Sequence, residues 1–316
     1  MNQPDNKKPL PRLGMLSKIR TMARRMNVPE GRLQKIVAVA IVSSLVPENT
    51  VIKGGNSLSL RFPLTQTRFS KDLDLVLSEG FERWKAEFSE NLKKGTDSFT
   101  GRLVDRGQPA AHPHVRNKID VFSYDVKLDY LGKAFATLPL DITSPIVYEK
   151  DQPPQEWSED TRSLMSYLGI ELGGRVRLLT VEAQLAQKSA ALFSDDPRPS
   201  DIVDMELLFS EMDRSGDEQT YTRLLKYELD ARGIPSPYGI GNLNILRKQY
   251  LSMFKDETVL DSVLARLHRT AELIQKDPVK TKTDALRMLE KKKENIMNLK
   301  ESKTQPQSHE KGGRER

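Results

Sequence analysis

The sequence predicts an α+β fold in which a region of mixed strands and helices is followed by an all-helical region. Residues 119–130 alternate with a period of two, which is typical of a β-strand. From Thr180 onward the apolar residues recur with helical spacing, and short polar or Pro- and Gly-containing segments separate the helices. The change of periodicity near residue 179 therefore predicts two structural halves.

The first half begins with a basic amphipathic helix over residues 12–26, which ends before Pro29. A second helix begins near Pro29, since proline is favoured in a first helical turn, and its apolar residues predict burial on most sides. Residues 50–53 are β-prone and stop at a Gly-Gly turn, which a helix follows. The other elements expected here are a strand at 73–77, a helix at 81–92, and strands at 99–104, 119–130 and 138–142.

The second half is expected to be a series of helices, whereas residues 145–178 show a mixed pattern that predicts no defined element. The expected helices cover residues 181–194, 200–212, 217–231, 242–254, 257–275 and 279–302. The predicted organisation is a basic N-terminal segment (1–28), a core (29–178), a helical domain (179–302) and a disordered tail (303–316).

Composition limits the chemistry that the chain can perform. The 316 residues include no cysteine, which excludes disulfides, zinc–thiolate sites, iron–sulfur clusters and thiol nucleophiles. The four histidines suggest no His-rich metal site, so a bound metal would have carboxylate ligands, as Mg²⁺ and Mn²⁺ prefer. No apolar run reaches the roughly 18 residues that a membrane span needs, so we expect a soluble, cytoplasmic protein without a membrane partner.

The net charge of +6 is concentrated at the two ends of the chain. Residues 1–26 hold seven basic side chains and one acidic side chain, and residues 276–316 hold twelve basic and seven acidic side chains. Basic ends can attract a phosphate backbone such as that of RNA. The alternative interpretation is that they only keep the chain soluble, and charge alone does not separate the two.

The most informative segment runs from Lys53 to Leu77, with Gly54-Gly55-Asn56-Ser57 at its start and Asp72-Leu73-Asp74 near its end. Residues two apart in a strand share a face, so the carboxylates of Asp72 and Asp74 would repel each other unless a cation lay between them. A Gly-Gly turn lets backbone N–H groups approach phosphate oxygens closely, and Asn56 or Ser57 could add a side-chain hydrogen bond. Together these features indicate binding of a nucleoside triphosphate with Mg²⁺.

A third carboxylate on a neighbouring strand would complete the metal ligands and could accept a proton from an attacking hydroxyl. The candidates are Asp120, Asp129 and Asp141. Asp141 lies among apolar neighbours on a short strand and is preferred, because Asp129 shares a face with Lys127 and could simply pair with it. The alternative for Asp141 is an ordinary carboxylate at a strand end.

Two further candidates lie in the helical half. Lys188 shares a helix face with apolar residues, so it either reaches water past its buried methylenes or points inward at phosphates. Ser200 is expected to cap the next helix, with Asp201 in its first turn and Asp204 one turn later. Asp201 could serve the site or could only complement the helix dipole.

These segments resemble the AbiEii/AbiGii nucleotidyltransferase toxin family, which includes related mycobacterial toxins. The similar motifs are Lys53-Gly54-Gly55, then Arg68-x-Ser70-x-Asp72-x-Asp74, the strand pair ending at Asp141, and the helices that carry Lys188 and Asp201. Asn56 stands where the family usually has Thr or Ser, and Ser200 stands where it has Arg.

The resemblance implies a DNA-polymerase-β-like mixed-sheet core followed by a C-terminal helical bundle. It implies nucleotide binding by Gly54, Gly55, Asn56, Ser57, Arg68 and Ser70, metal binding by Asp72, Asp74 and Asp141, and catalytic roles for these acids together with Lys188 and Asp201. It also implies a separate antitoxin protein and transfer of a nucleotide to RNA, as in relatives that modify the 3′ end of tRNA.

Two alternatives remain open from the sequence. A transferase of the same fold could instead modify a protein or small-molecule hydroxyl, in which case label would transfer without RNA. A non-enzymatic RNA- or partner-binding protein would tolerate alanine at Asp72.

Overall fold

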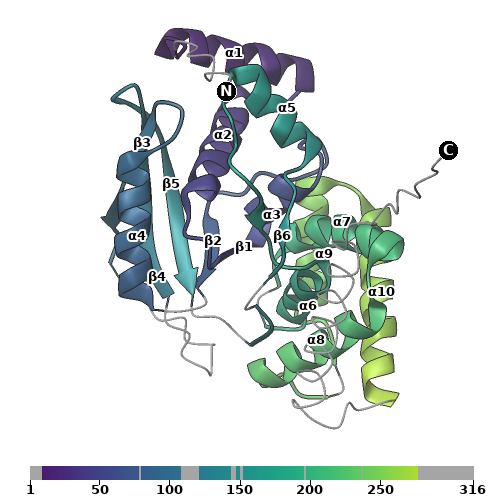
Figure 1. Cartoon of the computed structure of the whole chain (residues 1–316). Coiled ribbons are helices and arrows are strands. Elements are labelled where there is room, and N and C mark those ends of the chain that lie inside the picture. The colour runs from purple at the N-terminus through teal and green to yellow at the C-terminus, as the bar shows by residue number, and fades with distance from the viewer. Residues whose placement is uncertain are drawn as a thin grey trace, which may run out of the picture.

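The computed structural model describes residues 9–77, 80–107, 121–143, 147–149, 152–195, 197–236 and 238–276. Within these ranges the chain has a mixed α+β half followed by a helical half, as the sequence predicts (Figure 1). The expected helix at 279–302, the tail at 303–316 and Asp120 lie outside the described residues. None of the described helices is long and apolar enough to cross a membrane.

The first half follows the predicted order of elements. Its elements are α1 (Arg12–Met26), α2 (Glu30–Leu45), β1 (Thr50–Lys53), α3 (Gly54–Arg61), β2 (Leu73–Leu77), α4 (Phe81–Lys94), β3 (Phe99–Asp105), β4 (Val121–Tyr130) and β5 (Lys133–Thr143). Strand β5 starts five residues earlier than expected, because Leu131 and Gly132 both have positive φ and form a two-residue hairpin turn that pairs Tyr130 with Lys133.

The strands form one five-stranded sheet in the order β1-β2-β5-β4-β3. β2 pairs with β5 in parallel, and the other neighbours are antiparallel, so the sheet is mixed. One sheet face, with α1, α2 and α4, builds the first hydrophobic core. Trp84, Phe88 and Leu92 of α4 enter it at intervals of four residues, the spacing of one helix face.

The region of mixed pattern contains several short elements. They are the 3-10 helix η1 (Val147–Glu149), β6 (Pro154–Gln155), α5 (Glu159–Leu168) and β7 (Val176–Arg177). Helix α5 begins where the Ser158 side chain accepts a hydrogen bond from the Thr161 N–H, and it ends at Gly169. Its buried residues join the first core, against α1. The sequence pattern is mixed because strands of two residues are too short to show a period of two.

The helical half consists of α6 (Val181–Leu192), α7 (Pro199–Ser215), α8 (Glu218–Arg232), α9 (Leu243–Phe254) and α10 (Glu257–Lys276). These helices pack around a second hydrophobic core, which Val51 of β1 and Val76 of β2 also enter. The two cores therefore meet at β1 and β2: one face of these strands belongs to the first core, and the other face turns toward the helical half.

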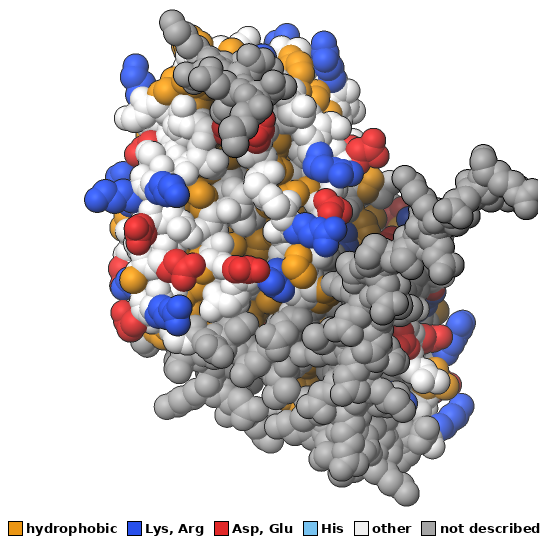
Figure 2. All heavy atoms as spheres, viewed as in Figure 1, with side chains coloured by type: hydrophobic (Ala, Val, Ile, Leu, Met, Phe, Trp, Pro, Cys, Tyr) orange, Lys and Arg blue, Asp and Glu red, His pale blue; other side chains and the backbone are white. Residues whose placement is uncertain are grey.

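Basic side chains of α1 are partly engaged within the protein. Arg12 donates a hydrogen bond to the Ala134 carbonyl, and Arg20 pairs with Glu30 on α2. In the described part of the face shown in Figure 2, Lys and Arg are interspersed with Asp and Glu rather than gathered in one patch. Two of the basic side chains of α1 therefore make contacts within the protein, and the basic charge of this helix is not reserved for binding a phosphate backbone.

Candidate active site

Four polar residues lie side by side across the sheet, on the face that turns toward the helical half. Lys53 of β1 is in register with Asp74 of β2, Asp74 with Asp141 of β5, and Asp141 with Ser123 of β4. Neighbours in register share a sheet face, so these side chains form one row. We call it the polar row.

The polar row concentrates negative charge at Asp74. The pKa of Asp74 is raised to about 6, chiefly by burial; Asp141 and Asp72 also raise it, whereas Lys53 and Lys188 lower it. A second cation beside these carboxylates would relieve their repulsion, and hard oxygen donors suit Mg²⁺ or Mn²⁺. The donor set therefore fits a divalent metal.

The protein alone does not provide a complete metal cage. Among the described residues, no group of three or more acidic or His side chains is arranged to hold a metal ion. Mg²⁺ commonly takes only one or two carboxylates from a protein and its remaining ligands from substrate phosphates and water. Metal binding by Asp72, Asp74 and Asp141 therefore stays a prediction, and it requires ligands that a bound nucleotide would supply.

The structure separates the candidates for the third carboxylate. Asp141 lies next to Asp74 on the parallel neighbour, and its Oδ1 accepts a hydrogen bond of 2.6 Å from Ser123 Oγ. Asp129 lies near the far end of β4 and pairs with Arg102 rather than with Lys127, which instead contacts Asp125. Only Asp141 of these two is positioned to act with Asp74.

Both glycines of the Gly-Gly pair are required by close packing. Gly54 has φ +70°, and a Cβ there would lie 1.9 Å from Asp74 Oδ2. A Cβ on Gly55 would lie 2.8 Å from the Cβ of Ser70. The pair therefore forms the start of α3 directly against Asp74 and Ser70, and no described side chain caps that helix end. Its free N–H groups are suited to bind phosphate.

Replacing Gly54 with alanine is expected to displace Asp74 and reduce enzymatic activity by about a hundredfold, with a loss of stability. The matched control is Gly169→Ala, because Gly169 has a similar φ of +77° and a Cβ added there would meet no described atom within 4 Å. The control should lose only about 1 kcal/mol of unfolding free energy and keep its activity. Urea denaturation and activity assays measure both quantities, and full activity of Gly54→Ala would contradict the packing argument.

Asn56 and Ser57 do not point their side chains at an open site. Asn56 Nδ2 donates to the Asp72 carbonyl at 2.7 Å, and Ser57 Oγ donates to the Gly54 carbonyl at 2.7 Å. Ser57 Oγ also accepts a hydrogen bond from Gln184 of α6. Both side chains are buried, so they fix the shape of the Gly-Gly segment, and phosphate contacts at these positions would come from backbone N–H groups.

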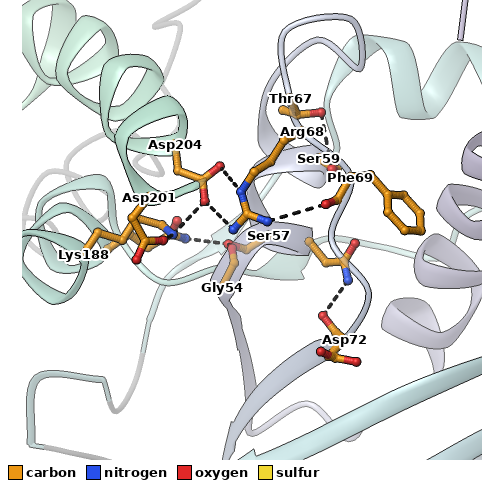
Figure 3. Close-up of polar contacts among 12 residues, drawn as sticks. Gly54, Ser57, Ser59, Thr67, Arg68, Phe69, Asp72, Lys188, Asp201 and Asp204 are labelled. Carbon is orange, nitrogen blue, oxygen red and sulfur yellow. Dashed lines mark hydrogen bonds and ion pairs between the residues drawn. The ribbon is translucent and has the colours of Figure 1, made fainter. Parts of the chain in front are cut away.

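A cluster of charges joins the loop before β2 to the helical half (Figure 3). Arg68 makes two hydrogen bonds to Asp204, from Nε at 2.9 Å and from Nη2 at 2.8 Å. Lys188 Nζ lies 2.7 Å from carboxylate oxygens of both Asp201 and Asp204. Burial opposes the charge of Lys188, but Asp201 and Asp204 outweigh it and raise its pKa. Lys188 is thus held by two acids instead of reaching water.

The sequence and the fold are both similar to those of known proteins. A model of the family described as nucleotidyl transferase AbiEii toxin, type IV toxin–antitoxin system, matches residues 36–294. The chain belongs to the AbiEii nucleotidyltransferase toxin family. The fold is similar to that of MenT4, a nucleotidyltransferase toxin from Mycobacterium tuberculosis, with a TM-score of 0.53 and 15% identity over 89% of this chain and 97% of MenT4. No curated protein matches the chain in sequence.

The AbiEii chain is therefore a nucleotidyltransferase and the toxin of a toxin–antitoxin pair, which implies an antitoxin partner. Its site contains residues that sequence reasoning missed. Lys53 Nζ pairs at 3.0 Å with the buried Glu149 of η1, which also accepts a hydrogen bond from Gln187 of α6. Glu149 lies in the segment of mixed pattern, so no periodic signal marked it. Gln184 and Gln187, polar residues on a helix with a buried apolar face, were the available clue.

Proposed function

We propose that this AbiEii toxin transfers a nucleoside monophosphate from a nucleoside triphosphate to RNA, with Mg²⁺ as cofactor and the 3′ end of tRNA as acceptor. Modification of that end would prevent aminoacylation and so inhibit translation and growth. The proposed location is the cytoplasm, where nucleotides and tRNA are present. The proposal deepens the family assignment by naming the metal and the acceptor.

The observation that carries the proposal is the register of Asp74 with Asp141, next to the start of α3. The two carboxylates lie on parallel neighbouring strands, and Gly54 contacts Asp74 directly. A triphosphate bound at the α3 N-terminus would thus meet the carboxylates at its charged end. This arrangement supports nucleotide transfer better than a purely structural role for the acids, because the neighbouring charge of Asp141 and the burial of Asp74 both disfavour an ionised Asp74 in the absence of a bound cation.

In the proposed reaction, the terminal ribose hydroxyl forms a bond to the α-phosphorus, and the bond from that phosphorus to the β-phosphate oxygen breaks, releasing pyrophosphate. Asp141 accepts the hydroxyl proton, since Ser123 binds only one of its oxygens. Bound Mg²⁺ would offset the negative charge on the phosphates. Lys188 and Arg68, fixed by Asp201 and Asp204, provide cations close to the same phosphates.

The test incubates purified protein with tRNA, Mg²⁺ and each of the four α-labelled nucleoside triphosphates. Label should enter tRNA with at least one nucleotide, whereas a γ-labelled nucleotide should leave tRNA unlabelled because its label departs with pyrophosphate. Asp72→Ala should reduce transfer about a hundredfold or more. In bacteria without the antitoxin, wild type should arrest growth and Asp72→Ala should not.

Controls separate the alternatives. tRNA whose terminal ribose has been oxidised with periodate lacks the acceptor hydroxyls and should remain unlabelled. Label that enters a protein in an RNA-free reaction would support the alternative acceptor class. Equal transfer by wild type and Asp72→Ala would refute the assignment of the acids.

A further inference from the structure

The loop between α3 and β2 presents one aromatic ring to solvent. Phe69 is 44% exposed, and it is the only aromatic residue among the large exposed hydrophobic side chains of the described ranges. An exposed phenyl ring has no role in either hydrophobic core. Its neighbours in sequence are Arg68 and Ser70, and Asp72 follows three positions later. Ser70 lies against Gly55, and Lys35 contacts both the Phe69 ring and the Lys71 carbonyl, so the ring lies beside the loop that leads to Asp72.

The loop that carries Phe69 is fixed at both ends. Arg32 of α2 donates a 2.5 Å hydrogen bond to the Leu64 carbonyl, and Asn56 of α3 donates a 2.7 Å bond to the Asp72 carbonyl. Hydrogen bonds from two different helices restrict the backbone of residues 64–72. The ring is thus held in position before a ligand arrives, which reduces the entropy lost on binding.

One side of the ring is already occupied. Lys35 of α2 places its ammonium 5.2 Å from the ring centroid, in a cation–π contact. The guanidinium of Arg68 lies on the other side of the loop, turned toward Asp204 (Figure 3). The exposed part of the Phe69 ring therefore remains available to a flat, apolar partner.

We propose that Phe69 stacks against a nucleobase of the substrate. The base belongs either to the nucleoside triphosphate or to the terminal nucleotide of the RNA acceptor, and both present the same flat ring. Every base has such a face, so stacking contributes affinity without selecting one base. The inference rests on the proposed function, since it assumes a nucleotide held by Asp72 and the start of α3.

A fluorescence experiment tests stacking independently of catalysis. Trp84 and Trp157 are 1% and 3% exposed, so the indole of a Phe69→Trp variant would be the exposed reporter among the described residues. ATP, GTP, CTP and UTP, each with Mg²⁺, or an RNA oligonucleotide ending in CCA, should quench it saturably. Inorganic tripolyphosphate, which has no base, should not. Quenching by the nucleotides identifies the triphosphate base, and quenching by RNA alone identifies the acceptor base.

The matched reporter is Leu273→Trp, because Leu273 on α10 is 45% exposed and far from this loop in sequence. Its fluorescence should not change with any of these ligands. No quenching of Phe69→Trp by any base-bearing ligand, or equal quenching by tripolyphosphate, would overturn the inference. If the wild-type protein transfers no nucleotide to RNA, the proposed function is refuted. The fluorescence experiment would still decide whether Phe69 stacks on a base.

Kinetics provide the second measurement. Phe69→Ala and Phe69→Leu should each raise KM for the base-bearing substrate about tenfold with a smaller effect on kcat. Phe69→Tyr, which keeps a flat ring, should restore KM to near the wild-type value. Leu273→Ala controls for the loss of exposed apolar surface. Wild-type KM in Phe69→Leu would show that a ring is not needed and would overturn the inference.

Discussion

Replacing Asp74 with asparagine is expected to reduce nucleotide transfer strongly and, at the same time, to stabilise the metal-free protein. Burial and the neighbouring carboxylates raise the pKa of Asp74 to about 6 from its usual 3.8, so the ionised side chain costs the folded state free energy. Asparagine removes that charge in a nearly identical shape. The expected gain in unfolding free energy is on the order of 1–3 kcal/mol at pH 7.5, and the loss of activity is about a hundredfold to a thousandfold.

The pH dependence has a definite sign. Because the folded-state pKa of Asp74 lies above its unfolded-state value, the destabilisation is complete above about pH 6 and decreases as the pH falls toward 3.8. The difference in Tm between Asp74→Asn and wild type, measured in a chelating buffer, should therefore be larger at pH 7.5 than at pH 5. At limiting Mg²⁺, activity of the wild type should decline below about pH 6, because the proton that Asp74 takes up in the metal-free protein competes with the metal.

Asp129→Asn is the matched control for Asp74→Asn. Asp129 is an acid of the same sheet that pairs with Arg102, and it was the alternative candidate for the third carboxylate. The variant should keep both its activity and its Tm, since exposed ion pairs contribute little. Reduced nucleotide transfer by Asp129→Asn would indicate that Asp129 acts in the candidate site. A Tm of Asp74→Asn below that of the wild type would contradict the argument from the charge of Asp74.

Asp204→Ala is expected to be the most destabilising single change in the charge cluster. Asp204 is 1% exposed and binds both Arg68 and Lys188, so its removal leaves a guanidinium without its carboxylate and a lysine with one partner. Breaking a buried pair in this way costs on the order of 3 kcal/mol or more. Urea denaturation should show a lower midpoint with little change in slope.

The comparison variant is Asp201→Ala, in which Lys188 keeps Asp204 and the bonds of Arg68 are untouched. Its loss of unfolding free energy should be less than half that of Asp204→Ala. Equal losses would show that the two acids hold Lys188 equally and that Arg68 adds nothing. Combining Arg68→Ala with Asp204→Ala should cost less than the sum of the single changes, because the two residues interact directly.

The local motif was predictable because its geometry depends on sequence spacing alone. Asp72 lies just before β2 and Asp74 lies within it, two residues later, whereas Gly54 and Gly55 directly follow β1. The position of the candidate site along the chain could therefore be predicted from sequence spacing. The third carboxylate was harder, because register between distant strands is a tertiary property. Three candidates fitted the sequence, and only the pairing of β2 with β5 places Asp141 next to Asp74.

Side-chain partners were the least predictable part. Periodicity placed Lys188 on an apolar helix face but could not show that α7 turns Asp201 and Asp204 toward it. Asn56 was expected to approach phosphate, whereas its amide holds the Asp72 carbonyl inside the protein. Whether a polar side chain contacts solvent, a ligand or another residue depends on how the helices pack against each other. That packing cannot be read from the periodicity of a single sequence. The catalytic roles of these residues stay predictions.

The proposed role of the polar row predicts when a nascent chain acquires its activity. Lys53, Asp74, Ser123 and Asp141 lie on four different strands, and Lys188 and Asp204 follow later in the chain. A polypeptide still on the ribosome, with only β1 and β2 released, holds the Asp-x-Asp pair together with Lys53 and Asn56, but it lacks Asp141, Lys188 and Asp204. Such long-range pairing forms late in folding. The toxin should therefore gain its activity in one step, after α7 has left the exit tunnel. Shorter translation products should not inhibit growth.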